Sequence, residues 1–200
     1  MARHHIIISG TGRAGTTFLV QLHTALGIDT GFADPHASIA ANCNAGMELD
    51  IRRPDAPYLV KSPFLCDYLD EVLETGDVVI DHAYVPVRDL YAAAESRRDV
   101  ERRTDPATCP GVTPGGHWNT EQPEQQESIL THQLYKLIFA LAKRDVPMTL
   151  LHFPRLVMDP AYLYSKLGPS LNGIGYERFL AAFEQLARPE LVHEFGPKRP

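Results

Sequence analysis

The sequence has 200 residues and is 44% hydrophobic, so it can bury the core of one domain of ordinary size. Its formal net charge of -6 argues against a general nucleic-acid-binding surface, and any anionic ligand would need a local cationic pocket. No apolar run approaches the ~20 residues that span a bilayer, and the opening stretch is too short for a signal peptide, so we expect a cytoplasmic protein without membrane partners.

Predicted strands and helices alternate along the chain. Short apolar runs rich in β-branched residues predict strands at 5–9, 57–61, 83–87 and 148–153, and a further short strand is expected to end near Asp34. Helical spacing or helix-forming composition predicts helices at 16–26, 62–76, 89–103, 124–145 and 176–187. This alternation is typical of an α/β fold, here a single domain over 1–200 with a doubly wound parallel sheet of four to five strands flanked by helices.

The first predicted strand runs into a glycine-rich turn and then a helix. The turn has the spacing of a phosphate-binding loop, but Thr16 stands where nucleotide hydrolases carry lysine. Glycines allow backbone N–H groups to approach a phosphate, and Arg13 can supply the missing cation through two donors at once. The simpler alternative is a turn that binds nothing. The predicted loop comprises Gly10, Thr11, Gly12, Arg13, Ala14, Gly15, Thr16 and Thr17.

The sequence GRAGTT at 12–17 resembles the 5′-phosphosulfate loop of sulfotransferases that use 3′-phosphoadenosine 5′-phosphosulfate (PAPS), which have a P-loop NTPase-like fold. In that family the cationic loop residue and the two hydroxyls after the glycine hold the 5′-phosphate and the sulfonate. By resemblance these roles fall on Arg13, Gly15, Thr16 and Thr17. The resemblance covers 5–30 and 57–98 and becomes vague after 104.

A second motif of the same family holds the 3′-phosphate of the donor. The family places an arginine after a strand and a serine eight residues later, and Arg88 and Ser96 have that separation here. Positions seven or eight apart share one face of a helix, so both side chains could converge on one phosphate. Taken alone, the pair could equally be a surface arginine and an ordinary helix serine.

Lys61 ends a predicted strand within a K-S-P segment that is similar to segments of the same family. There the lysine stabilises charge on the leaving phosphate, as expected of a cation aimed at a transition state. Gly10, Lys61 and Arg88 each follow a predicted strand, and ligands of open α/β sheets bind at that edge. A solvated lysine at the strand end is the alternative.

The expected general base is not where the family often has it. Many members carry histidine two residues after this lysine, and this chain has Pro63 there. We expect Glu48 or His36 to accept the proton of the acceptor, with Asp50 as a further candidate. A carboxylate among cations is more commonly an ion-pair partner.

An irregular stretch at 104–120 has the length of a functional lid. It contains Trp118, which could stack on the adenine, cover the acceptor, or simply anchor the loop. Four arginines lead into it and could line the donor site or form a solvated helix face; they are Arg97, Arg98, Arg102 and Arg103.

These patterns together indicate a sulfotransferase that moves a sulfonate from PAPS to a small-molecule acceptor, most simply a hydroxyl. Arg13 would hold the 5′ end of the donor, and Lys61 and Thr16 would stabilise the leaving group. The protein's own cations neutralise the charge, and the three cysteines have no paired metal spacing, so we expect no metal.

Two alternatives stay open. A small-molecule kinase would use ATP and Mg²⁺, with Thr17 on the metal and Asp34 as base, although the missing lysine argues against it. A nucleotide-binding protein without turnover is the other, because no histidine follows Lys61. The chain is short for the sulfotransferase family, so a small acceptor, or a homodimer that completes the pocket, is also expected.

Overall fold

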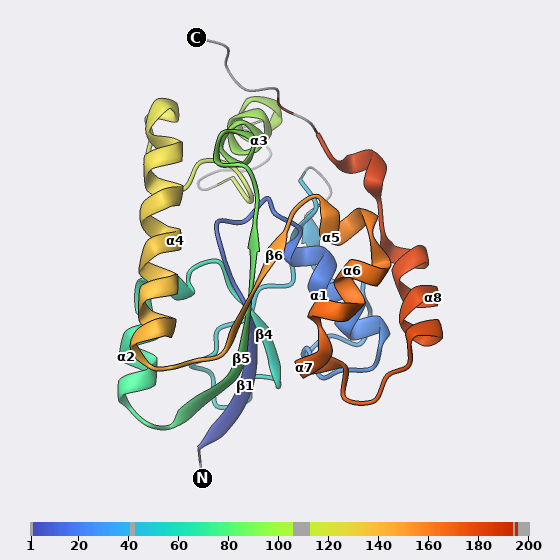
Figure 1. Cartoon of the computed structure of the whole chain (residues 1–200). Coiled ribbons are helices and arrows are strands. Elements are labelled where there is room, and N and C mark those ends of the chain that lie inside the picture. The colour runs from blue at the N-terminus through green and yellow to red at the C-terminus, as the bar shows by residue number, and fades with distance from the viewer. Residues whose placement is uncertain (1, 41–42, 106–112, 194, 196–200) are drawn as a thin grey trace.

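A four-stranded parallel sheet forms the centre of the molecule (Figure 1). The computed structural model describes residues 2–40, 43–105, 113–193 and 195. Its strand order is β4-β1-β5-β6. The strands are β1 (Arg3–Ile8), β4 (Leu59–Lys61), β5 (Val78–Val87) and β6 (Met148–His152). The prediction of an α/β fold with a parallel sheet flanked by helices is confirmed.

Helices cover both faces of this sheet. In Figure 1, α2, α3 and α4 lie on one side of the strands, and α1 lies with the C-terminal helices on the other. The long helices are α1 (Thr16–Ala25), α2 (Leu65–Glu74), α3 (Leu90–Arg103), α4 (Gln126–Lys143) and α8 (Tyr176–Leu186). The short ones are η1 (Pro123–Gln125), α5 (Arg155–Met158), α6 (Pro160–Lys166), α7 (Gly168–Leu171) and η2 (Pro189–Leu191).

The continuous apolar run of β1 explains why this strand is central. Successive side chains of a strand point to opposite faces, so Ile6 and Ile8 join the core on the α1 side while Ile7 joins the core of α2 and α4. A strand buried on both faces needs apolar residues at every position, and this run supplies them.

The strand order brings the carboxyl ends of β1, β4 and β5 to one edge of the sheet. The chain leaves β1 for β4 on one side and returns to β5 on the other, so the loop after β1 lies at the point where the direction of winding reverses. This is the position where open α/β sheets bind ligands.

The segment between α1 and β4 differs from the prediction. The stretch near Asp34 is irregular rather than a strand, because turns interrupt it. A small antiparallel ribbon follows instead, formed by β2 (Ile39–Ala40) and β3 (Ala45–Gly46). Its second strand leads into the residues that approach Lys61.

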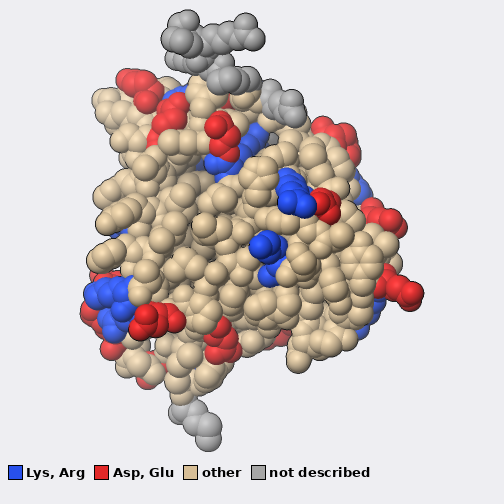
Figure 2. All heavy atoms as spheres, viewed as in Figure 1, with Lys and Arg blue, Asp and Glu red and all other residues tan. Residues whose placement is uncertain are grey.

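The surface in view carries charges of both signs around large uncharged areas, without a continuous basic stretch (Figure 2). None of the helices in the described part of the chain is both long and apolar enough to cross a membrane.

Candidate active site

The loop after β1 has left-handed backbone at three of its positions. Gly12, Arg13 and Gly15 all have positive φ, at 66°, 54° and 84°. A Cβ atom at Gly12 would lie 2.6 Å from Nη2 of Arg97, and one at Gly15 would lie 2.8 Å from Cδ1 of Leu156, so both positions need glycine. Among the described residues, no oxygen accepts a hydrogen bond from the backbone N–H groups of 10–17. These N–H groups, at the start of α1, are the donors that an anion would use.

Arg13 lies inside this loop and is mostly buried. Its Nε donates to Oγ of Ser96 at 3.0 Å, and its Nη1 donates to the carbonyl of Cys43 at 2.5 Å. Burial lowers the pKa of the Arg13 guanidinium below its ordinary value. The side chain is therefore held by neutral oxygens alone, and its charge has no carboxylate partner among the described residues.

Arg88 approaches the loop from the end of β5. Its Nη1 donates to the carbonyl of Arg13 at 2.9 Å and its Nη2 to that of His193 at 2.6 Å. The guanidinium also lies 4.8 Å from the ring centre of Phe153. Burial, and then the charge of Arg13, lower its pKa to about 10.

Arg88 and Ser96 both lie beside the loop, and their shared role on the 3′-phosphate stays a prediction. Both residues contact Arg13, but Ser96 accepts from the Arg13 side chain, whereas Arg88 donates to the Arg13 backbone. The physical reason is that the loop turns Arg13 toward α3, where it reaches the serine first. The three residues do lie together, as the sequence predicted.

Arg97 is a third buried cation, which the sequence placed only in a general basic cluster. Its side chain is 6% exposed. Nη2 donates to the carbonyl of Thr11 at 2.6 Å, and Nη1 to that of Gly116 at 2.7 Å. Burial, and then the charge of Arg13, lower its pKa to about 9. No ion pair with a carboxylate is found for it in the described part of the chain.

The other three arginines of that cluster have acidic partners, and of these Arg102 and Arg103 are exposed whereas Arg98 is largely buried. Arg98 pairs with Glu95 and Glu127, and Arg103 pairs with Asp99. Spacing in the sequence distinguishes Arg97 from them. Arg97 follows Ala93 by four residues and precedes Val100 by three, so it shares the face of α3 on which these two apolar residues are buried.

Lys61 extends the cationic group from the end of β4. Its side chain is 3% exposed, and Nζ donates to Glu48 Oε1 at 2.6 Å, to the Gly46 carbonyl at 2.6 Å and to Thr17 Oγ1 at 3.0 Å. Burial lowers the pKa of Lys61, and the Glu48 carboxylate opposes that shift. The lysine thus contacts the loop, as expected from strand-end geometry, and is not a solvated surface residue.

The two base candidates have different positions. Glu48 lies beside Lys61 as its ion-pair partner, with 36% of its side chain exposed. His36 is exposed in a turn where its backbone N–H donates to Asp34 Oδ1, and within the described part of the chain it makes no hydrogen bond to the other site residues. The structure therefore brings Glu48 to the loop and does not bring His36 there.

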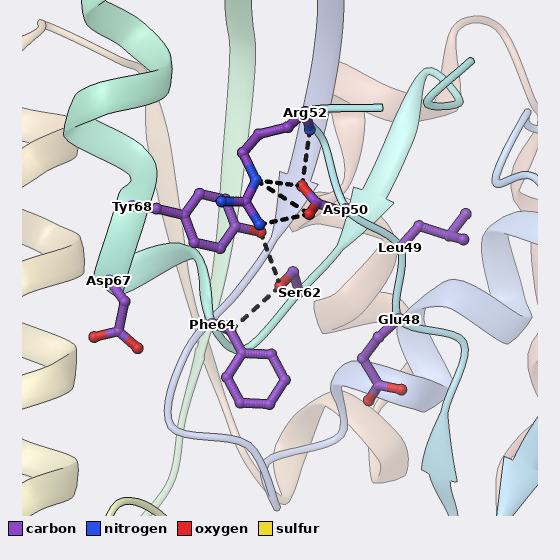
Figure 3. Close-up of a pocket in the computed structure, with 8 residues that line it drawn as sticks. All are labelled: Glu48, Leu49, Asp50, Arg52, Ser62, Phe64, Asp67 and Tyr68. Atoms are coloured by element: carbon purple, nitrogen blue, oxygen red, sulfur yellow. Dashed lines mark hydrogen bonds and ion pairs between the residues drawn. The ribbon is translucent and has the colours of Figure 1, made fainter. Parts of the chain in front are cut away.

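A hollow with a volume of about 460 Å³ adjoins this ion pair (Figure 3). Asp50 and Arg52 lie side by side in its wall and pair through both carboxylate oxygens, and the Arg52 guanidinium lies 4.1 Å from the ring centre of Tyr68. The ring of Phe64 is 52% exposed beside it. Its lining residues are Glu48, Leu49, Asp50, Arg52, Ser62, Phe64, Asp67 and Tyr68. Sequence reasoning missed this hollow, which forms where an irregular segment meets the turn before α2 and the start of that helix.

Trp118 is buried at the end of the described part of the 104–120 stretch, of which 106–112 lies outside the described residues. Its ring packs against Phe64 and against the Arg97 guanidinium. This position matches the anchoring role among the alternatives considered for Trp118.

Comparison with models of known protein families gave no match, and comparison with curated proteins gave none either.

Proposed function

We propose that the protein is a sulfotransferase that transfers the sulfonate of PAPS to a hydroxyl group of a small acceptor. The observation that carries this proposal is a set of three arginines, the buried Arg97 and the partly buried Arg13 and Arg88, around a glycine loop whose N–H groups have no acceptor in the described chain. Buried charge is costly unless it is paired, and no carboxylate pairs with these three in the described chain. A ligand with several negative charges would supply the missing partner.

In this proposal each group around the loop binds one part of the donor. Arg13 and the N–H groups of the loop bind the 5′-phosphate and the sulfonate, since guanidinium groups and helix N-termini suit tetrahedral anions. Arg88 binds the 3′-phosphate after exchanging the carbonyl of His193 for phosphate oxygens. Ser96 positions Arg13 through the bond that it accepts.

Transfer follows an in-line path at the sulfur. The acceptor oxygen attacks the sulfur, the bond from sulfur to the bridging oxygen breaks, and its electron pair goes to the 5′-phosphate. Lys61 and the hydroxyl of Thr16 stabilise that charge, and Lys61 already contacts the neighbouring Thr17. The proton of the acceptor goes to Glu48, whose carboxylate lies between Lys61 and the hollow.

The acceptor occupies the hollow beside Glu48. The three carboxylates that line the hollow each have a cationic partner already. Asp50 pairs with Arg52, Glu48 with Lys61 and Asp67 with Lys136. A charged acceptor would have to break these pairs, whereas an uncharged one would lie on the exposed ring of Phe64. We therefore propose an uncharged acceptor.

Transfer of label from PAPS tests this function. The protein is incubated with PAPS labelled in its sulfonate and with uncharged alcohols and phenols, in the presence of a metal chelator. Label should move to at least one acceptor, and Lys61→Met should abolish the transfer while Lys143→Met, which removes an exposed lysine paired with Asp70, retains it. Binding of the donor without transfer to any acceptor would support a nucleotide-binding protein instead. Phosphate transfer from ATP that requires Mg²⁺ would support the kinase alternative.

A further inference from the structure

A row of three side chains runs from the hollow to the phosphate loop. The rings of Phe64 and Trp118 meet edge to face, with centres 5.9 Å apart. The guanidinium of Arg97 lies 5.0 Å from the ring centre of Trp118, and its Nη2 donates to the carbonyl of Thr11 in the loop. One contact series therefore joins a wall of the hollow to the loop.

Trp118 is held in this row from outside. Its backbone N–H donates to Oε1 of Gln126 at 2.8 Å, and Nε2 of Gln126 donates back to its carbonyl at 3.1 Å. Gln126 is fully buried at the start of α4. The backbone of Trp118 is thus fixed by Gln126 rather than by the loop. Arg97 is the residue of this row that contacts the loop and can change its contacts when the loop binds an anion.

The charge of Arg97 is only partly compensated. Two carbonyl oxygens and one ring face surround it, and its Nε has no hydrogen-bond partner among the described residues. The buried indole Nε1 of Trp118 also has none there. An anion in the adjacent loop would supply countercharge, and would change how strongly Arg97 holds the Thr11 carbonyl and the indole face.

We propose that Arg97 is a positioning residue that couples occupancy of the phosphate loop, through the buried Trp118, to Phe64 in the wall of the hollow. The identity of the anion rests on the proposed function, but the coupling requires only an anion in the loop. Coupling of this kind is reciprocal, so a ligand in the hollow alters anion binding in the loop by the factor by which the anion alters binding in the hollow.

The chain contains one tryptophan, so its fluorescence reports Trp118 alone. Titration with 3′-phosphoadenosine 5′-phosphate should give a saturable change in emission that follows binding measured by calorimetry. In Arg97→Lys we expect binding about tenfold weaker and no emission change, because lysine lacks the planar guanidinium whose separate nitrogens reach both carbonyl oxygens while its face stacks on the indole. A purely structural role would lower thermal stability and leave both readouts intact, which would overturn the proposal.

Phe64→Ala provides a second variant that should fold, because this ring is 52% exposed. In the described structure the Phe64 side chain makes no hydrogen bond or ring contact with residues 10–17. The coupling nevertheless predicts about threefold weaker nucleotide binding in this variant, and unchanged affinity would contradict it. Tyr135→Ala, an exposed aromatic on α4, is the matched control and should bind as the wild type does.

The two proposals fail in different ways. Binding of the nucleotide by the wild type without any emission change refutes the coupling and leaves the donor assignment intact. If calorimetry detects no binding of the nucleotide, the donor assignment fails, and inorganic pyrophosphate then serves as the loop anion. An emission response to pyrophosphate that Arg97→Lys abolishes would still support the coupling, and no response would refute it.

Discussion

The ion pair of Lys61 and Glu48 predicts unequal effects of removing its two members. Glu48→Gln leaves a buried ammonium, 3% exposed, without its counterion. A hydrogen bond to a charged group contributes ~1.5–3 kcal/mol, and because 36% of the Glu48 side chain is exposed, we take the lower part, about 1.5–2 kcal/mol. For a chain of this size that loss corresponds to a fall of roughly 3–8 °C in Tm.

Lys61→Met should cost less, about 0–1 kcal/mol, because the substitution also removes a desolvated charge and leaves the exposed carboxylate to water. Chemical denaturation at pH 7 of both single variants and the double variant measures the loss in unfolding free energy for each substitution and the interaction between the two. We expect the double variant to be about as stable as Lys61→Met. A Glu48→Gln variant that is as stable as the wild type, or more stable than Lys61→Met, would refute the reasoning. The predicted asymmetry would indicate that the charge of Lys61 serves activity rather than stability.

Three further predictions concern stability and reactivity. Gly15→Ala should destabilise the fold by about 1–3 kcal/mol more than Gly76→Ala, since both have positive φ but only the first brings a Cβ within 2.8 Å of Leu156; equal losses in denaturant would contradict this. His23 is buried and neutral, with a pKa of about 4 in the folded protein and 6.5 in the unfolded chain. As pH falls from 6.5 toward 4 only the unfolded state binds the proton, so the free energy of unfolding is highest above pH 6.5 and decreases over this window. Unfolding free energy should fall by roughly 3 kcal/mol over that window, and His23→Gln should flatten the profile. Burial raises the pKa of Cys66 to about 12, so mass spectrometry should find its thiol unalkylated by iodoacetamide in native protein at pH 8 and alkylated after denaturation.

Features tied to strand ends could be predicted from the sequence. The parallel sheet follows from the alternation of apolar runs and helices, and it brings the loop after β1, Lys61 and Arg88 to one edge. The glycine pattern at 10–15 likewise predicts left-handed backbone, which the structure has at Gly12 and Gly15. These inferences depend only on local pattern and on the geometry of parallel sheets.

Features that depend on irregular segments could not be predicted. The hollow is built from 48–52 and 62–68, and no periodicity fixes how these segments face each other. The partner of Ser96 depends on the direction in which Arg13 leaves its loop, which spacing along α3 does not determine. The burial of Arg97 could be inferred in part from the sequence, because its position on the buried face of α3 distinguishes it from the neighbouring arginines.

Nucleotide selectivity tests the central claim most directly. Calorimetry in the presence of a chelator should compare 3′-phosphoadenosine 5′-phosphate with AMP, and a parallel titration should use ATP with Mg²⁺. Each is measured on wild type, on Arg88→Ala and on Arg103→Ala, which removes an exposed arginine paired with Asp99. We expect the 3′-phosphate to strengthen wild-type binding roughly 10- to 100-fold, as a charge-assisted contact would, and Arg88→Ala alone to remove that preference. Equal binding of the 3′-phosphorylated nucleotide and AMP, or tightest binding of ATP with Mg²⁺, would contradict the donor assignment.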